Sequence, residues 1–399
     1  MDFESANPFN VLVNKISGNL LPMTIDGSPF PILWKIYSSL IWLLELTEMM
    51  ILLPGCILVP KGKALKDGVV AIAVTLEVLF VVTRIHMRRG LVQRIIQRVN
   101  EILYLDDEMM QNIVTASLKS MEIPLKFYWS AGVMSIVLWS GTPLLMIFKK
   151  NSFSYVDYRM PVAYGKEPIS TDSFVIGSLI VMSSSVLMFT KKVAVDSYMI
   201  HLILLITAQY RYIASKLSVI FRDETTRRDS NDPIGDKNYS TSDLSAQKEI
   251  KAVCRHHNTI VRVMSMLKEL LSLNFNFLYI NSVFRFCFIG IMILAVPSTN
   301  LLEGSLIIMY ASGGIVQLYI LCSCVQQLLD AAVEITNKAF HEKWYLHEPS
   351  VKRMFLLLIM ANNLDCKLAT FEKFNLSLPS FMAILNQSYS IALLVFRTI

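Results

Sequence analysis

The side chains that could do chemistry in this chain lack the spacing that catalysis or metal binding requires. His201, His256 and His257 do not stand at ligand spacing from acids or cysteines. The sequence has no P-loop, no GxGxxG and no GxSxG motif. None of the six cysteines forms a CxxC pair, and most lie in or beside apolar segments: Cys56, Cys254, Cys287, Cys322, Cys324 and Cys366. We therefore expect no enzyme, no metal site and no cofactor.

These residues have plainer interpretations. The cysteines are expected to be small buried hydrophobic residues. His256 and His257 lie in a basic helical segment, where we expect them to face solvent or a partner subunit.

Four charged residues lie inside long apolar segments: Glu45, Glu48, Glu77 and Arg285. A charge at membrane depth is costly and usually faces protein or water, so each is a functional candidate. The alternative is that they only tie helices together or contact a water-filled vestibule, and the sequence does not say which residues pair.

The composition of the chain is that of a membrane protein. Its 399 residues are 54% hydrophobic and 17% charged, whereas soluble chains carry about 25% charged residues. The net charge of +6 is spread between apolar runs, so we expect no nucleic-acid partner. Seven runs are long enough to span a bilayer: 32–59, 68–85, 124–148, 172–192, 271–296, 303–324 and 377–397. The end of the fourth is open, because apolar sequence resumes after Lys192 and continues to Ile206.

The distribution of basic residues predicts the orientation. With a cytoplasmic N-terminus, inside segments hold 26 of the 37 Lys and Arg residues and outside segments hold eight. Seven spans then place the C-terminus outside, opposite to a G-protein-coupled receptor. The third span has no DRY-like triplet after it and the seventh has no NPxxY. The sequons at Asn238 and Asn375 fall on the predicted cytoplasmic side, where they would carry no glycan.

Helical patterns also lie outside the spans. Apolar residues at spacings of three and four over 193–220, 250–270, 326–346 and 350–364 predict a packed cytoplasmic helical bundle. The expected organisation begins with a cytoplasmic N-terminal segment that contains an interfacial helix (1–31), followed by transmembrane helices 1–4 with an inner extension (32–220). A mobile cytoplasmic loop (221–249) then leads to an inner helix with transmembrane helices 5–6 (250–324). Cytoplasmic anchor helices (325–376) and a last, pore-lining helix (377–399) complete the chain.

Several motifs of the C-terminal third resemble the insect odorant receptor family. They are GGIVQLYILCSCVQQL (313–328), NKAFHEKWY (337–345), KRMFLLLIM (352–360) and FNLSLPSFMAILNQSYSIALLVF (374–396). His257, the segment VDSYMIHL around Asp196 and RMPVAYG (159–165) extend the resemblance toward the N-terminus. The sequence departs from the family at Phe340, where Tyr is frequent, and at Arg397, near the outer end of the last span, where a small or amide side chain would be less surprising.

The resemblance implies an all-α membrane protein that acts as a tuning subunit of an odorant-gated, non-selective cation channel. Such a subunit forms a heterotetramer with the odorant receptor co-receptor, binds a small volatile organic ligand and contacts membrane lipids. Its expected place is the plasma membrane of the dendritic cilia of olfactory sensory neurons. A gustatory-type relative of the same channel fold and a seven-helix G-protein-coupled receptor remain the alternatives.

The resemblance also implies two sites. The last span forms the pore, where Gln387, Ser390, Leu394 and Arg397 share one helix face and Leu394 is the gate candidate. Alternatively, Gln387 and Ser390 only bond across packed helices. The odorant pocket lies in the outer halves of spans two, three, four and six, which here supply Ile72, Ala73, Leu76, Trp139, Thr142, Phe174, Ser178, Met182, Ile307 and Tyr310.

Overall fold

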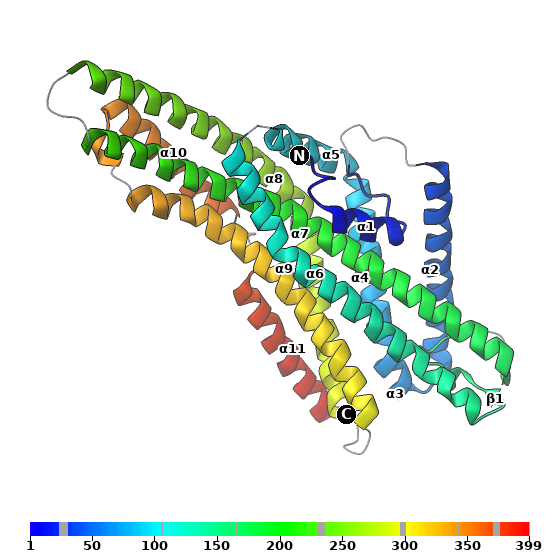
Figure 1. Cartoon of the computed structure of the whole chain (residues 1–399). Helices are drawn as coiled ribbons and strands as arrows, with labels where there is room; N and C mark the ends of the chain where they lie inside the picture. Colours follow the sequence, from blue (N-terminus) through cyan, green and yellow to red (C-terminus); the bar gives the residue numbers. More distant parts are fainter. Residues whose placement is uncertain are drawn as a thin grey trace.

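The computed structural model describes residues 1–23, 31–104, 107–163, 166–229, 236–295, 301–341, 344–369 and 376–398, which are mostly helical (Figure 1). The α-helices are α1 (Pro8–Ile16), α2 (Ile32–Leu58), α3 (Lys61–Lys63), α4 (Val69–Met87), α5 (Arg89–Leu103), α6 (Glu108–Gly141), α7 (Thr171–Asp229), α8 (Asp236–Ala295), α9 (Leu301–His341), α10 (Pro349–Ala369) and α11 (Leu378–Thr398). A π-helical turn, η1 (Ala64–Gly68), precedes α4, and 3₁₀ turns are η2 (Thr142–Phe148), η3 (Tyr155–Asp157) and η4 (Trp344–Leu346). The strands β1 (Ser152–Phe153) and β2 (Ile169–Ser170) pair antiparallel, with Ser152 opposite Ser170.

The predicted all-α membrane fold is confirmed. Six of the described helices are long and apolar enough to cross a membrane, namely α2, α6 with η2, α7, α8, α9 and α11. The shorter α4 coincides with the second predicted run. Each predicted span therefore lies on a helix.

The fourth span and the helical pattern after it form one helix. α7 runs without interruption from Thr171 to Asp229, past Lys191 and Lys192. No Pro or Gly lies near the two lysines, and each is bonded to a carboxylate inside the protein, so their charge does not end the helix. α8 likewise combines a predicted span with a predicted inner helix, and α9 combines the sixth span with the helix predicted over 326–346 as far as His341.

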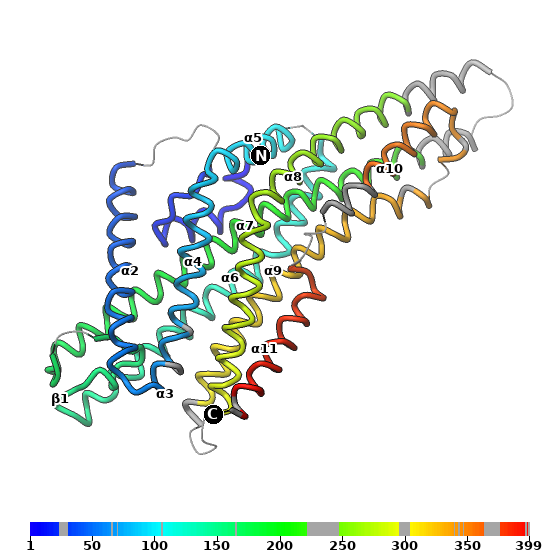
Figure 2. Tube along the Cα trace, turned by 180° about the vertical axis from the view of Figure 1, so that it is seen from behind, coloured from blue at the N-terminus to red at the C-terminus, as the bar shows by residue number. Residues whose placement is uncertain are grey.

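The middle of α7 is the centre of the core. Every residue from 190 to 210 is buried, because α7 packs against α1, α2, α4, α6, α8 and α9. A helix that is buried on all sides is apolar around most of its circumference, as the sequence from Val193 to Ile206 is. Figure 2 shows α7 passing diagonally through the bundle.

α2 lies at the edge of the bundle (Figure 2) and exposes apolar side chains along its whole length. Leu33, Leu40, Met50 and Ile57 have exposed fractions of 80%, 59%, 72% and 83%. This stripe suits contact with lipid tails.

The expected N-terminal helix is short, and its apolar face is buried in protein. α1 ends at Ile16, and Phe9 and Val13 are buried. The Phe9 ring meets Trp129 of α6 edge to face at 6.2 Å. The apolar face of α1 is therefore covered by the bundle.

The loop predicted over 221–249 is wrong in extent. α7 continues to Asp229 and α8 begins at Asp236, so both flanks of the segment are helical. Pro233 and Gly235, the strongest helix breakers of the segment, lie between these two ends and outside the described residues.

The expectation that His256 and His257 face solvent or a partner subunit is also wrong. The Nε2 atom of His257 lies 3.3 Å from Oδ1 of Asn362 on α10. The Nε2 atom of His256 lies 3.1 Å from Oε1 of Gln209 on α7. Both rings therefore join α8 to neighbouring helices of the same chain.

Candidate functional site

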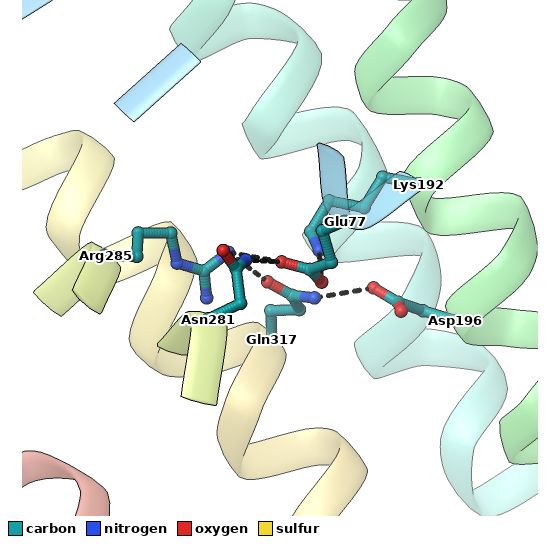
Figure 3. Close-up of polar contacts among 6 residues, drawn as sticks. All are labelled: Glu77, Lys192, Asp196, Asn281, Arg285 and Gln317. Carbon is teal, nitrogen blue, oxygen red and sulfur yellow. Dashed lines mark hydrogen bonds and ion pairs between the residues drawn. The ribbon is translucent and has the colours of Figure 1, made fainter. Parts of the chain in front are cut away.

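Six polar side chains from four helices meet in the middle of the bundle and form what we call the ionic network (Figure 3). Lys192 donates a hydrogen bond to Glu77, and Asn281 Nδ2 donates to Glu77 Oε2 at 2.5 Å. Nη1 of Arg285 donates to Oε1 of Gln317 at 3.0 Å. Nε2 of Gln317 donates in turn to Oδ2 of Asp196 at 2.8 Å, so the network joins α4, α7, α8 and α9.

The charges of the ionic network balance. Glu77 and Asp196 supply two carboxylates, while Lys192 and Arg285 supply two cations, and all four residues are at most 5% exposed. Nη1 of Arg285 also lies 3.9 Å from Oε2 of Glu77. A buried charge is tolerated when it is paired and hydrogen-bonded, and removal of one partner leaves a costly excess charge. The network therefore fixes the relative positions of its helices.

The other two acids noted in the apolar segments, Glu45 and Glu48, lie on α2 and also face α7. Glu45 forms a buried ion pair with Lys191, whose Nζ lies 3.8 Å from the centre of the Trp42 ring. Glu48 accepts hydrogen bonds from Ser184 and, at 3.3 Å, from Ser185. All four charges noted in the sequence thus bond to other helices.

The sequence interpretation missed the partners of these charges. Lys191 and Lys192, which follow the fourth predicted span, are both buried. The available signal was that apolar sequence resumes directly after them, which is unusual for a loop. Asp196 was noted only as part of a motif.

A second polar feature is a hollow of about 10 Å³ between α6, α7 and the segment that connects them. Trp139, Ser140 and Pro143 form one wall, Ser178 and Val181 of α7 form another, and Tyr158, Arg159 and Met160 close it. Space of this size holds about one water molecule, so a larger ligand must displace wall side chains.

The segment that closes the hollow, residues 158–162, is inserted between helices, and we call it the inserted segment. Tyr158, Met160 and Val162 are buried. A Cβ atom at Gly55 of α2 would overlap the carbonyl oxygen of Pro161, and one at Gly177 of α7 would lie 2.7 Å from the Tyr158 hydroxyl. These two glycines therefore make room for the segment.

The expected odorant-pocket residues fall into separate places. Trp139 and Ser178 line the hollow, and Phe174 stacks on Phe153 at 4.1 Å in the apolar cluster beside it, to which Ile72 also packs. Ile307 packs with Met292 between α8 and α9, where Tyr310 joins it. Of the others, Ala73 and Met182 are half-buried, and Leu76 is 48% exposed. The Thr142 hydroxyl donates a hydrogen bond to the Leu138 carbonyl at 2.9 Å.

α11 packs on α8 and α9 with one face and leaves the opposite face uncovered by the described chain (Figure 1). Ile384, Ser388 and Ala392 are buried, and Ser388 donates to the Val283 carbonyl of α8 at 3.1 Å. The four expected pore residues are all exposed: Gln387, Ser390, Leu394 and Arg397. Gln387 also accepts a hydrogen bond from the Tyr279 hydroxyl of α8 at 3.2 Å.

Comparisons with known proteins agree with this architecture. Two solved structures of the insect olfactory receptor OR5 from Machilis hrabei share the fold, each covering 98% of this chain. The first, in complex with eugenol, has a TM-score of 0.74 at 14% identity over 98% of its own chain, and the second has 0.75 at 13% over 97%.

Sequence comparison gives the family. Odorant receptor 67a of Drosophila melanogaster is 20% identical over 142 residues, which are 36% of this chain and only about a third (34%) of that relative. The model of the 7tm odorant receptor family matches residues 64–389, most of the chain. This multi-pass membrane protein therefore belongs to the 7tm odorant receptor family.

Proposed function

We propose that this odorant receptor is a subunit of an odorant-gated, non-selective cation channel that acts in a heterotetramer with the odorant receptor co-receptor. The observation that carries the proposal is the uncovered face of α11, which bears Gln387, Ser390, Leu394 and Arg397. A polar stripe that ends in an apolar constriction is the arrangement that a gated pore requires. Leu394 is the proposed gate.

The ligand of this channel binds among the outer halves of the helices. We place it in and around the hollow beside Trp139 and Ser178, with the cluster at Tyr310 as the second candidate. A large ring with a polar edge and nearby hydroxyl groups suit a small ligand with one polar group. The fold is shared with a structure in complex with eugenol, which supports a small volatile ligand here.

Two helices connect the proposed ligand site to the proposed pore. α7 carries Ser178 at the hollow and Asp196 in the ionic network. α8 carries Arg285 in the network and contacts α11 through Tyr279 and Val283. Ligand binding that shifts α7 is therefore transmitted to α11 through the network and α8.

The opposite end of the molecule supplies a surface for the co-receptor. α9 and α10 extend beyond the rest of the bundle (Figure 2). There Val333, Phe340, Leu357 and Met360 are 48%, 52%, 58% and 62% exposed. Exposed apolar side chains on helices outside a membrane favour burial against another protein. We assign this surface to subunit assembly.

The proposed orientation has the N-terminus in the cytoplasm and the C-terminus outside, in the plasma membrane of dendritic cilia. An epitope inserted within residues 222–248 should bind antibody only after permeabilisation. Asn238 should carry no glycan, and Asn375 lies outside the described residues. Labelling of this epitope on intact cells would contradict the orientation.

Currents recorded from cells that express the chain with and without the co-receptor, against an odorant panel, test the function. We expect odorant-evoked cation currents only with the co-receptor, and we expect them to persist when G-protein signalling is blocked. Loss of the current under that block would favour a G-protein-coupled receptor. Currents without the co-receptor would favour a gustatory-type relative.

A further inference from the structure

The wall of the hollow contains hydrogen-bonding groups that have no partner among the described residues. They are the Ser140 and Ser178 hydroxyls and two nitrogen atoms of Arg159, Nε and Nη2. Both serines are 4% exposed, and the two Arg159 nitrogens are themselves buried. Buried polar atoms are nearly always bonded in folded proteins, so four such atoms around one hollow indicate a missing partner.

The Arg159 side chain is held in place by contacts that leave its Nε and Nη2 atoms unbonded in the described part of the chain. Its Cζ atom lies 5.3 Å from the centre of the Trp139 ring, in a cation–π contact. The neighbouring residues Tyr158 and Met160 are buried between the helices, which fixes the backbone on both sides. The guanidinium therefore lies against the hollow.

Acidic residues of the same connecting segment are engaged elsewhere. Asp157 accepts from Lys150 at 2.8 Å and from the Ser154 backbone N–H at 2.9 Å. Burial raises the pKa of Asp157, but these hydrogen bonds outweigh it and hold the pKa below its ordinary value. Glu167 accepts from the Tyr155 backbone N–H at 2.6 Å. Within the described residues, neither acid pairs with Arg159.

The positions of the two unbonded nitrogens on the Arg159 guanidinium favour one kind of partner. Nε and Nη2 lie on one edge of the planar guanidinium, and their N–H groups point in parallel. This edge binds two oxygens of one planar group at once, and the bond is strongest when the oxygens carry charge. The remaining wall residues Trp139, Pro143, Met160 and Val181 are mainly apolar and suit a hydrocarbon chain.

We propose that Arg159 makes this hollow selective for ligands with two acceptor oxygens on one carbon, as in a carboxylic acid or its ester. The inference rests on the proposed function and gives the chemical class of its ligand. Ser140 and Ser178 provide further hydrogen bonds, and the ligand chain displaces wall side chains of the hollow.

The test uses the full-length receptor with the co-receptor and three probes of one chain length: hexanoic acid, methyl hexanoate and 1-hexanol. The wild type should respond to the acid or the ester at concentrations about tenfold lower than to the alcohol. Arg159→Gln should abolish this preference. Arg159→Lys keeps the positive charge but lacks the two parallel N–H donors of the guanidinium. It should therefore retain a preference for the acid and lose the preference for the ester.

Lys149→Gln is the matched control, because it removes one positive charge from an exposed position of the same connecting segment. It should leave the preference unchanged, at equal surface expression. A wild type that prefers the alcohol, or an unchanged preference in Arg159→Gln, would overturn the inference.

Thermal stabilisation of the purified receptor by the same three probes measures binding without a channel. If the currents are absent but Arg159→Gln still abolishes the binding preference, the site stands and the proposed channel function fails. If the channel responds to odorants but the binding preference does not depend on Arg159, the inference fails alone.

Discussion

The ionic network and the hollow are both polar regions inside an apolar bundle, but their polar atoms are bonded to different extents. In the network, four helices contribute two carboxylates and two cations with bonded partners, although Nε of Arg285 has none among the described residues. Around the hollow, two serine hydroxyls and one edge of Arg159 have no partner there. A bonded cluster holds helices together, whereas an unbonded one is suited to a ligand.

The strongest test of this difference removes one charge from the ionic network. Lys192→Met leaves two carboxylates against the single cation Arg285, which should destabilise the protein by about 3 to 5 kcal/mol. The effect should appear as a loss of surface expression and of thermal stability in detergent. Adding Glu77→Gln restores the charge balance and should recover much of the loss.

Lys338→Met is the control for this prediction, because Lys338 forms an exposed ion pair with Glu334. Exposed pairs contribute at most about 1 kcal/mol. Equal losses in Lys192→Met and Lys338→Met would mean that the network does not hold the helices.

A smaller effect is expected where the inserted segment passes between helices. Gly55→Ala places a Cβ atom against the backbone of Pro161, so the segment must shift, at a cost of about 1 to 3 kcal/mol. Odorant potency should fall, because the same segment closes the hollow. Gly62→Ala is the matched control, since a Cβ atom there meets nothing within 4 Å. Normal potency in Gly55→Ala would separate the segment from ligand binding.

The third prediction compares the two candidate ligand regions. Trp139→Ala removes a ring from the hollow, and Tyr310→Ala removes one from the cluster between α8 and α9. The variant that removes a ligand-contacting ring should lose about tenfold in odorant potency, equivalent to about 1.4 kcal/mol. We expect this of Trp139→Ala, measured as dose–response curves at equal surface expression. If only Tyr310→Ala shifts potency, the ligand lies in the second cluster.

The smallest effects are expected at the proposed pore face, because the proposed heterotetramer would contain only some copies of this chain. Arg397→Gln should raise cation conductance or calcium permeability, since rings of Arg oppose cation entry. Leu394→Ala should loosen the proposed apolar gate and raise the basal current. Single-channel recordings measure both. Unchanged conductance, selectivity and basal opening in both variants would remove this face of α11 from the pore wall.

Much of the fold could be predicted from the sequence, because long apolar runs allow little but membrane helices. The helical pattern after Lys192 correctly indicated a helix, but the sequence did not show that it continues the fourth span. The extent of the loop over 221–249 was predicted wrongly, because polar composition does not exclude helix where Pro and Gly are absent. The predicted environment of His257 was also wrong, because its partner Asn362 lies 105 residues away in the sequence.

The sequence by itself determined the membrane class, the helical spans, the resemblance to the odorant receptors and the shared face of Gln387, Ser390, Leu394 and Arg397. These properties depend on composition and local spacing, which the sequence displays directly. Only the tertiary structure decided that Lys192 bonds to Glu77, 115 residues away, and that Arg159 and Ser178 line one hollow. Contacts between separate helices depend on how those helices pack and leave no periodic signal in the chain, so the sequence identified the charges but could not pair them.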